Sequence, residues 1–130
     1  MGILREDKEN GWLIYSSWRV GPSRCPALDK DVYFTLKGWN HLIRPGGMKR
    51  RDPKDLHRRL AVLPLAKQII EKSTTIQNIT RKGKTNYFVL EAMMPIKEKG
   101  LATYKKVRVI LYEDRAGVIK FLSVMPRRQK

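Results

Sequence analysis

The chain has 130 residues and a formal net charge of +16, from 28 Lys and Arg against 12 Asp and Glu. Apolar residues make up 42% of it, enough for a hydrophobic core, which excludes a disordered tail. One cysteine excludes an intrachain disulfide framework, and no apolar run approaches the ~20 residues that span a bilayer, so we expect a cytoplasmic protein with no membrane contact. So strong a positive charge favours a polyanionic partner.

The first predicted element is a strand near the N-terminus. Trp12, Ile14, Trp18 and Val20 fall on alternate positions, as in a strand with one apolar face. The Gly- and Pro-containing segment 21–26 then ends it. We expect a single domain, divided into an N-terminal extension with this strand over residues 1–30, a core over 31–126 and a basic tail over 127–130.

A second strand and a short helix are predicted next. Val32–Phe34 is a short apolar run, and Leu36–Ile43 suits one or two helical turns. Gly46 and Gly47 follow Pro45, which predicts a loop.

Two helices are predicted after that loop. Asp52 suits the cap and Pro53 the first helical position, and leucines recur at helical spacing up to Val62. Pro64 would cost roughly 3 kcal/mol inside a helix, so we expect a break there. The predicted helices are Pro53–Val62 and Leu65–Lys72.

The remainder is predicted to form two hairpins. Thr75–Thr80 and Thr85–Met93 flank a turn with Gly83, and Tyr104–Tyr112 and Gly117–Met125 flank a turn at residues 113–116. The expected fold class is α+β, with the N-terminal strand and the helices packed on a roughly four-stranded antiparallel sheet.

The positive charge belongs mainly to the middle and the end of the chain. Residues 45–84 carry 11 basic and 3 acidic side chains. A single charge run is often just a solvated helix face, but several basic clusters in one small domain favour a surface for phosphates. The candidate nucleic-acid contacts are Arg44, Lys49, Arg50, Arg51, His57, Arg58, Lys82, Lys84 and Lys120.

The available side chains suit chemistry without a metal ion. The carboxylates and histidines do not occur in ligand spacing, so we expect neither a metal ion nor an organic cofactor. RNA can be cleaved by its own 2′-hydroxyl, which requires from the protein a base, an acid and cations. His41 and His57 are the two imidazoles near neutrality.

The order of these elements resembles the barnase–EndoU–colicin–RelE group of small RNases, in particular its phage- and toxin-associated branches. Three motifs carry the resemblance: a strand followed by a helical histidine in Val32–Arg44, a helix leading to an Ile-rich segment in Leu60–Ile79, and an apolar–Ser–x–apolar–Pro ending in Phe121–Pro126. The resemblance implies a metal-independent endoribonuclease of the toxin or effector type, which leaves a cyclic phosphate.

The resemblance also implies roles for particular residues. His41 matches the helical histidine, as general base or acid, and Ser123 matches the last-strand residue that positions the phosphate. Arg108 and Lys106 are the expected cationic stabilisers of the transition state. In a regular strand Lys120 lies on the face opposite Ser123, so only one of the two would meet the substrate.

One departure from the group leaves undecided which residue would be the second acid or base. Its members often carry a second histidine shortly after the first, whereas here Arg44 and the Pro-Gly-Gly segment follow. Either His57 folds back to supply it, or a basic residue stands in.

The expected partners are RNA, with tRNA and ribosome-associated mRNA both open, and an acidic antitoxin or immunity protein. One alternative is a noncatalytic RNA- or ribosome-binding module that stacks bases on Trp12, Trp18, Trp39 or Tyr87, although core packing is the simpler role for these aromatics. A DNA-binding regulator with a recognition helix around His57 is the least favoured.

Overall fold

The computed structural model describes residues 2–44, 51–98 and 100–127. The predicted loop at residues 45–47 and the candidate contacts Lys49 and Arg50 lie outside these ranges. In chain order the elements are α1 (Gly2–Trp18), β1 (Ser23–Cys25), β2 (Lys30–Tyr33), α2 (Leu36–Ile43), α3 (Pro53–Lys72), β3 (Asn78–Lys82), β4 (Thr85–Glu98), β5 (Leu101–Glu113) and β6 (Ile119–Pro126). The α+β class is therefore confirmed.

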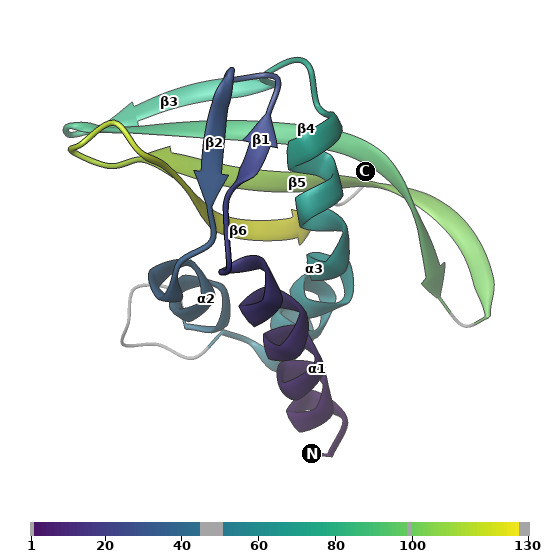
Figure 1. The fold of residues 1–130 in the computed structure, drawn as a ribbon. Helices are drawn as coiled ribbons and strands as arrows, with labels where there is room; N and C mark the ends of the chain where they lie inside the picture. The colour runs from purple at the N-terminus through teal and green to yellow at the C-terminus, as the bar shows by residue number, and fades with distance from the viewer. Residues whose placement is uncertain (1, 45–50, 99, 128–130) are drawn as a thin grey trace.

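The sheet differs from the prediction in its number of strands and in their relative direction. Over the described ranges it has six strands in the order β1-β2-β6-β5-β4-β3 (Figure 1). The β2–β6 pair is parallel and the other pairs are antiparallel, so the sheet is mixed. The four predicted strands correspond to β3–β6. Local pattern missed β1 because it is three residues long and depends on β2 for its hydrogen bonds.

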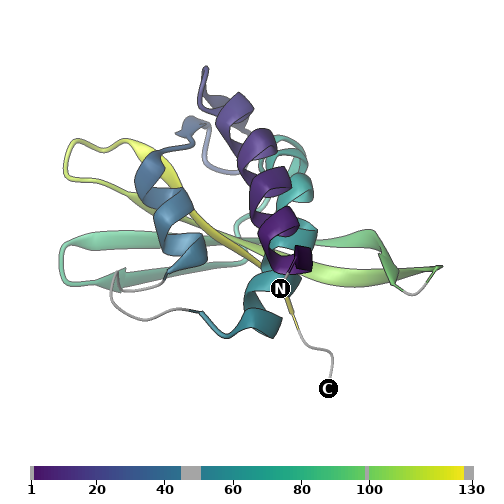
Figure 2. The same cartoon turned by 90° about the horizontal axis from the view of Figure 1, so that it is seen from below.

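The two faces of the sheet have different surroundings. Val107, Val109 and Leu111 on β5 are fully buried on the face against which α3 packs. Helices α1 and α3 gather on this side (Figures 1 and 2). We call the other side of β3–β6 the open face, since no described helix covers it except at the β6 edge. Its residues on β4 and β5 are Tyr87, Val89, Glu91, Met93, Lys106, Arg108, Ile110 and Tyr112.

The predicted N-terminal strand is wrong, because residues 2–18 form helix α1. Gly11 and Tyr15, which are four residues apart, are buried, and Tyr15 is completely so. The alternation placed Tyr15 on a polar face, whereas its ring packs on Phe34 and Phe121 at 5.7 Å between centroids. The segment taken for an extension is thus part of the main core.

The predicted helix break at Pro64 is also wrong, because α3 runs unbroken from Pro53 to Lys72. Pro64 is exposed, so the backbone hydrogen bond that it lacks is lost on the side facing water. The same helix buries leucines and isoleucines on both sides of Pro64. Each is worth about 1.5–3 kcal/mol when fully buried, and together they outweigh the proline's roughly 3 kcal/mol.

The predicted capping and turns are confirmed. The Asp52 carboxylate accepts a hydrogen bond from the Lys54 amide at 2.8 Å, and Asp55 lies in the first turn. Gly83 has φ +61°, a conformation that a residue with a Cβ rarely adopts. Helix α2 begins and ends at the predicted residues, Leu36 and Ile43.

Helix α2 lies unusually close to β6 at Gly38. A Cβ added there would be 2.5 Å from the Phe121 carbonyl oxygen and 2.7 Å from the Tyr15 hydroxyl. We expect Gly38→Ala to lower the free energy of unfolding by about 1–3 kcal/mol, because the backbone of β6 must give way. Urea unfolding followed by tryptophan fluorescence measures this, with Gly21→Ala, which meets nothing within 4 Å, as the control. Equal stability of the two variants would contradict the close docking.

Candidate functional site

Helices α2 and α3 and strand β6 meet at one group of polar side chains. We call it the His41 cluster; its members are His41, Arg51, Asp55, Arg59 and Ser123. Arg51 closes the end of α2: its Nη2 donates to the His41 carbonyl at 3.0 Å, and its Nε donates to the Leu42 carbonyl at 2.7 Å. These hydrogen bonds satisfy carbonyls that a helix C-terminus leaves open.

A single carboxylate joins the two arginines of the cluster. Asp55 accepts hydrogen bonds from Arg51 at 3.0 Å and from Arg59 at 3.1 Å. Burial opposes the charge of Asp55, yet the two guanidinium groups hold its pKa below the usual value. Both guanidinium groups are largely buried, so two cations share one anion and an excess of positive charge remains. This excess positive charge acts electrostatically on the neighbouring His41 imidazole.

Arg59 also connects this network to the sheet. Its Nη1 donates to the Ser123 Oγ at 2.7 Å. Ser123 is 1% exposed, so its hydroxyl holds Arg59 in place and does not meet solvent. Arg59 can reach it because β2 pairs with β6 at Ile119 and Lys120, and no other strand in the described parts of the chain pairs with the rest of that edge of β6.

The His41 imidazole is half-buried beside these cations. Burial lowers its pKa, and the positive charges of Arg51, Arg59 and Lys37 lower it further. A hydrogen bond with the Leu122 backbone raises the pKa but does not offset these effects. The lowered pKa favours the neutral imidazole at pH 7. Its Nδ1 is buried and has no hydrogen-bond partner among the described residues. A neutral imidazole with a vacant nitrogen can accept a proton.

A pocket of about 300 Å³ opens beside His41. Tyr87 and Tyr112, which are direct partners on β4 and β5, line it together with Lys37 and Arg115. The Lys37 ammonium lies 5.0 Å from the centre of the Tyr112 ring. Aromatic rings next to cations are a common setting for nucleotides.

The alternation expected for β6 fails at a β-bulge. Ser123 pairs with Ile110 and Phe121 with Leu111, so Leu122 is an extra residue. Lys120 pairs with Tyr112 on the same side of β5 as Ile110, which puts Lys120 and Ser123 on one face. The prediction that they lie on opposite faces is therefore wrong. Lys120 is held by Asp114 at 2.9 Å.

Arg108 and Lys106 are not drawn into the His41 cluster. The Arg108 Nη2 lies 3.0 Å from Glu91, whose side chain is 5% exposed, and Arg127 contacts the same carboxylate at 3.3 Å. Lys106, two residues before Arg108 on β5, is half-buried. Its backbone carbonyl accepts a hydrogen bond from the Arg127 amide at 2.8 Å. Both residues lie on the open face. On β5 they come before Ile110, the residue that pairs with Ser123.

His57 does not fold back to supply a second imidazole. Its Nδ1 lies 2.6 Å from the Asp7 carboxylate on α1. The other described candidate contacts are on the surface: Arg44 at the end of α2, Arg58 on α3, and Lys82 and Lys84 on either side of the Gly83 turn. Arg51, predicted as an RNA contact, is instead 8% exposed and occupied within the cluster.

Sequence reasoning missed Arg59, which was passed over in favour of its neighbour Arg58. A signal was present, since Arg51, Asp55 and Arg59 are each four residues apart and form i,i+4 ion pairs. The contact of Arg59 with Ser123 spans 64 residues and had no local signal.

The tryptophans pack in the core, as the simpler interpretation had it. Trp39 is 7% exposed, and Trp12 and Trp18 pack against the same core cluster. Tyr87 is the member of the predicted stacking set that lines the pocket.

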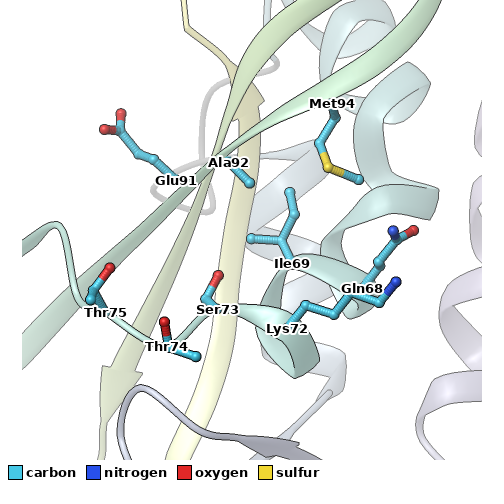
Figure 3. A pocket seen from close by; sticks show the side chains of 9 residues that line it. All are labelled: Gln68, Ile69, Lys72, Ser73, Thr74, Thr75, Glu91, Ala92 and Met94. Carbon is cyan, nitrogen blue, oxygen red and sulfur yellow. The ribbon is translucent and has the colours of Figure 1, made fainter.

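A second pocket, of about 270 Å³, lies between the end of α3 and β4 (Figure 3). The Glu91 carboxylate points away from it, toward the contacts with Arg108 and Arg127 described above. Among the described residues, the buried side-chain polar atoms without a partner are Ser23 Oγ and His41 Nδ1, and neither residue lines this pocket. The His41 pocket is the better candidate for chemistry.

Within residues 2–44, 51–98 and 100–127, no three His, Cys, Asp or Glu side chains are grouped as metal ligands would be. None of the described helices combines the length and apolar character needed to cross a bilayer. Comparisons with models of protein families, with curated proteins and with solved structures find no match.

Proposed function

We propose that the protein is a metal-independent endoribonuclease with His41 as the general base. One observation carries this: the half-buried imidazole of His41, whose pKa is lowered, lines the pocket and lies beside two guanidinium groups that share one carboxylate. The resemblance of the element order and motifs to the barnase–EndoU–colicin–RelE group supports the same activity.

The reaction needs few protein groups. His41 takes the proton of the ribose 2′-hydroxyl, the 2′-oxygen bonds to phosphorus, and the bond from phosphorus to the 5′-oxygen breaks. The products are a 2′,3′-cyclic phosphate and a 5′-hydroxyl that takes its proton from solvent. Negative charge grows on the phosphoryl oxygens in the transition state, where the excess positive charge of the cluster is most effective.

The roles of the surrounding residues follow from their contacts. Arg51 and Arg59 both act on the His41 imidazole through their charge, and Arg59 is fixed from two sides, by Asp55 and by Ser123. Ser123 is thus a positioning residue. Lys37 lines the pocket, and in this proposal its ammonium binds the substrate phosphate. Arg108 and Lys106 become contacts for the RNA backbone along the open face.

The test is incubation of the purified protein with RNA in excess EDTA, followed by analysis of the product ends. Cleavage that persists in EDTA and leaves 2′,3′-cyclic phosphate ends is expected. Cleavage that stops on removal of metal ions would overturn the proposal. Because such an activity harms the cell that makes it, an acidic antitoxin or immunity protein is a proposed partner for the basic surface.

A noncatalytic RNA- or ribosome-binding module is the second candidate. It is favoured by the engagement of His57 with Asp7, which leaves the cluster with one imidazole. In this case RNA binds with high affinity but is not cleaved under any condition of the EDTA assay.

The affinity for RNA at the Gly83 turn is expected to fall as the salt concentration rises. We expect Lys82→Ala with Lys84→Ala to weaken RNA binding and to reduce the slope of log K against log[salt] by about 1.4, since each single-strand phosphate contact contributes about 0.7. The control removes the same charge from α1, on the far side of the sheet, by Arg5→Ala with Lys8→Ala. Fluorescence anisotropy from 50 to 300 mM salt measures both. An equal effect of the two pairs would mean that the charge acts without a defined surface.

A further inference from the structure

Strands β4 and β5 extend beyond their neighbours in the sheet. Pairing of β3 with β4 stops at Val89, and pairing of β6 with β5 stops at Val107, whereas β4 and β5 continue to the Glu98–Leu101 pair. We call residues 93–98 and 101–106 the β4–β5 ribbon. It projects past the rest of the sheet in both views (Figures 1 and 2). Met94 and Ile96 pack against the core on one side of the ribbon, and its other side has no further strand or helix over it in the described parts of the chain.

One side of the ribbon continues the open face. Alternate residues of β5 share a side, so Tyr104, Lys106 and Arg108 project from the same face as Tyr112, at the His41 pocket. Tyr104 is 67% exposed. Eight residues of strand separate the two tyrosines, a span of about 26 Å, which suits several nucleotides of an extended strand.

The charge of this face suits a phosphate backbone. Arg108 and Arg127 share the carboxylate of Glu91, which leaves one positive charge in excess, and Lys106 lies next along the strand. On this face of β5, Tyr104 and Tyr112 are the aromatic residues at the two ends, and Lys106 and Arg108 are the cations between them. Proteins that bind single strands combine stacking platforms with a basic path, and a duplex cannot offer its bases in this way.

We propose that the β4–β5 ribbon is a distal binding arm for single-stranded RNA, on which a base stacks on Tyr104 several nucleotides from the bond at His41. The ligand class rests on the proposed function, but binding by the arm does not require cleavage.

The test uses RNA that cannot be cleaved, with a 2′-O-methyl group at every ribose. Tyr104→Ala is expected to weaken binding of a 12-nucleotide single strand by about fivefold to a hundredfold, the range for loss of one stacked base. Tyr104→Phe keeps the ring and the affinity. Binding of a blunt duplex of the same sequence, and the rate of cleavage of an unmodified dinucleotide, stay unchanged because neither engages the arm.

Leu101→Ala is the matched control, since Leu101 is 69% exposed and lies on the other side of the same strand. Unchanged affinity of Tyr104→Ala, or an equal loss in Leu101→Ala, overturns the proposal. So does loss of a dimer in light scattering on Tyr104 substitution, which would make a second copy of the chain the occupant. A protein that cleaves nothing but still shows the Tyr104 dependence would refute the nuclease and keep the arm.

Discussion

Replacement of His41 with alanine is expected to lower the rate of RNA cleavage by about 10²–10⁴-fold, the usual contribution of a general base. The side chain is half-buried and its hydrogen bond is with the Leu122 backbone, so its removal is expected to cost about 0.5–1.5 kcal/mol, which leaves the protein folded. Circular dichroism and a melting curve check that the variant is folded. Retained cleavage in a folded His41→Ala protein would refute the assignment.

The pH dependence gives an independent readout of the same group. A general base acts in its neutral form, and burial lowers the pKa of His41. The rate is therefore expected to rise with pH through a value below 6.5 and then to level off, so that activity persists at a pH where an exposed histidine is already protonated. A rise centred above pH 6.5 would point to another base.

His57→Ala is the matched control for His41→Ala. His57 is exposed and pairs with Asp7 on α1, outside the His41 cluster. Its removal is expected to leave the cleavage rate unchanged, which separates the loss of a particular imidazole from the loss of any histidine.

Replacement of Arg59 with alanine is expected to affect both stability and cleavage. Its guanidinium side chain is 13% exposed and bridges Asp55 and Ser123, so the variant leaves the buried Ser123 hydroxyl without its donor. Removing one partner from a fully buried pair costs about 3–5 kcal/mol. Since Asp55 is 40% exposed and keeps Arg51, we expect a loss of about 2 kcal/mol in the free energy of unfolding.

The adjacent Arg58→Ala is the control, with the same change in charge at an exposed position of the same helix. Its stability is expected to stay within about 0.5 kcal/mol of wild type. Urea unfolding measures both variants, and the EDTA assay measures cleavage. Equal stabilities would show that the Asp55–Arg59–Ser123 network does not hold the fold.

Acid should narrow the difference between Arg59→Ala and wild type. The pKa of Asp55 is lower in the folded protein than its usual value, so ionised Asp55 stabilises the fold above that usual value. This contribution is lost as the pH falls through the lowered value. Unfolding at pH 7 and at pH 3 therefore reports whether Arg59 acts through Asp55.

Much of the β half of the fold was predictable from the sequence. The Gly83 turn, the hairpin of β5 and β6 and the buried run Val107, Val109 and Leu111 follow from local pattern, since neighbouring strands in a hairpin need only a turn and alternation. The errors concern segments whose structure depends on distant partners. Helix α1 was mistaken for a strand because four apolar residues alternate, while its true face forms only against α3 and the aromatic core.

The candidate site shows the same division. His41 and Ser123 were predicted from motif resemblance. The hydrogen bond from Arg59 to Ser123 was not predicted, because it requires the docking of α3 at the edge of β6. The bulge at Leu122, which brings Lys120 and Ser123 to one face, inserts one residue and leaves no mark in the composition of the strand.

The sequence by itself determined the α+β class, the net charge of +16, the capped start of α3 and the hairpin turns, because each depends on composition or on residues a few positions apart. Tertiary structure alone decided the continuity of α3 through Pro64, the parallel pairing of β2 with β6, and the contact of Ser123 with Arg59 in place of Arg58. The physical reason is that these features are stabilised by burial and by contacts between residues far apart in the chain, whose free energy outweighs local preference.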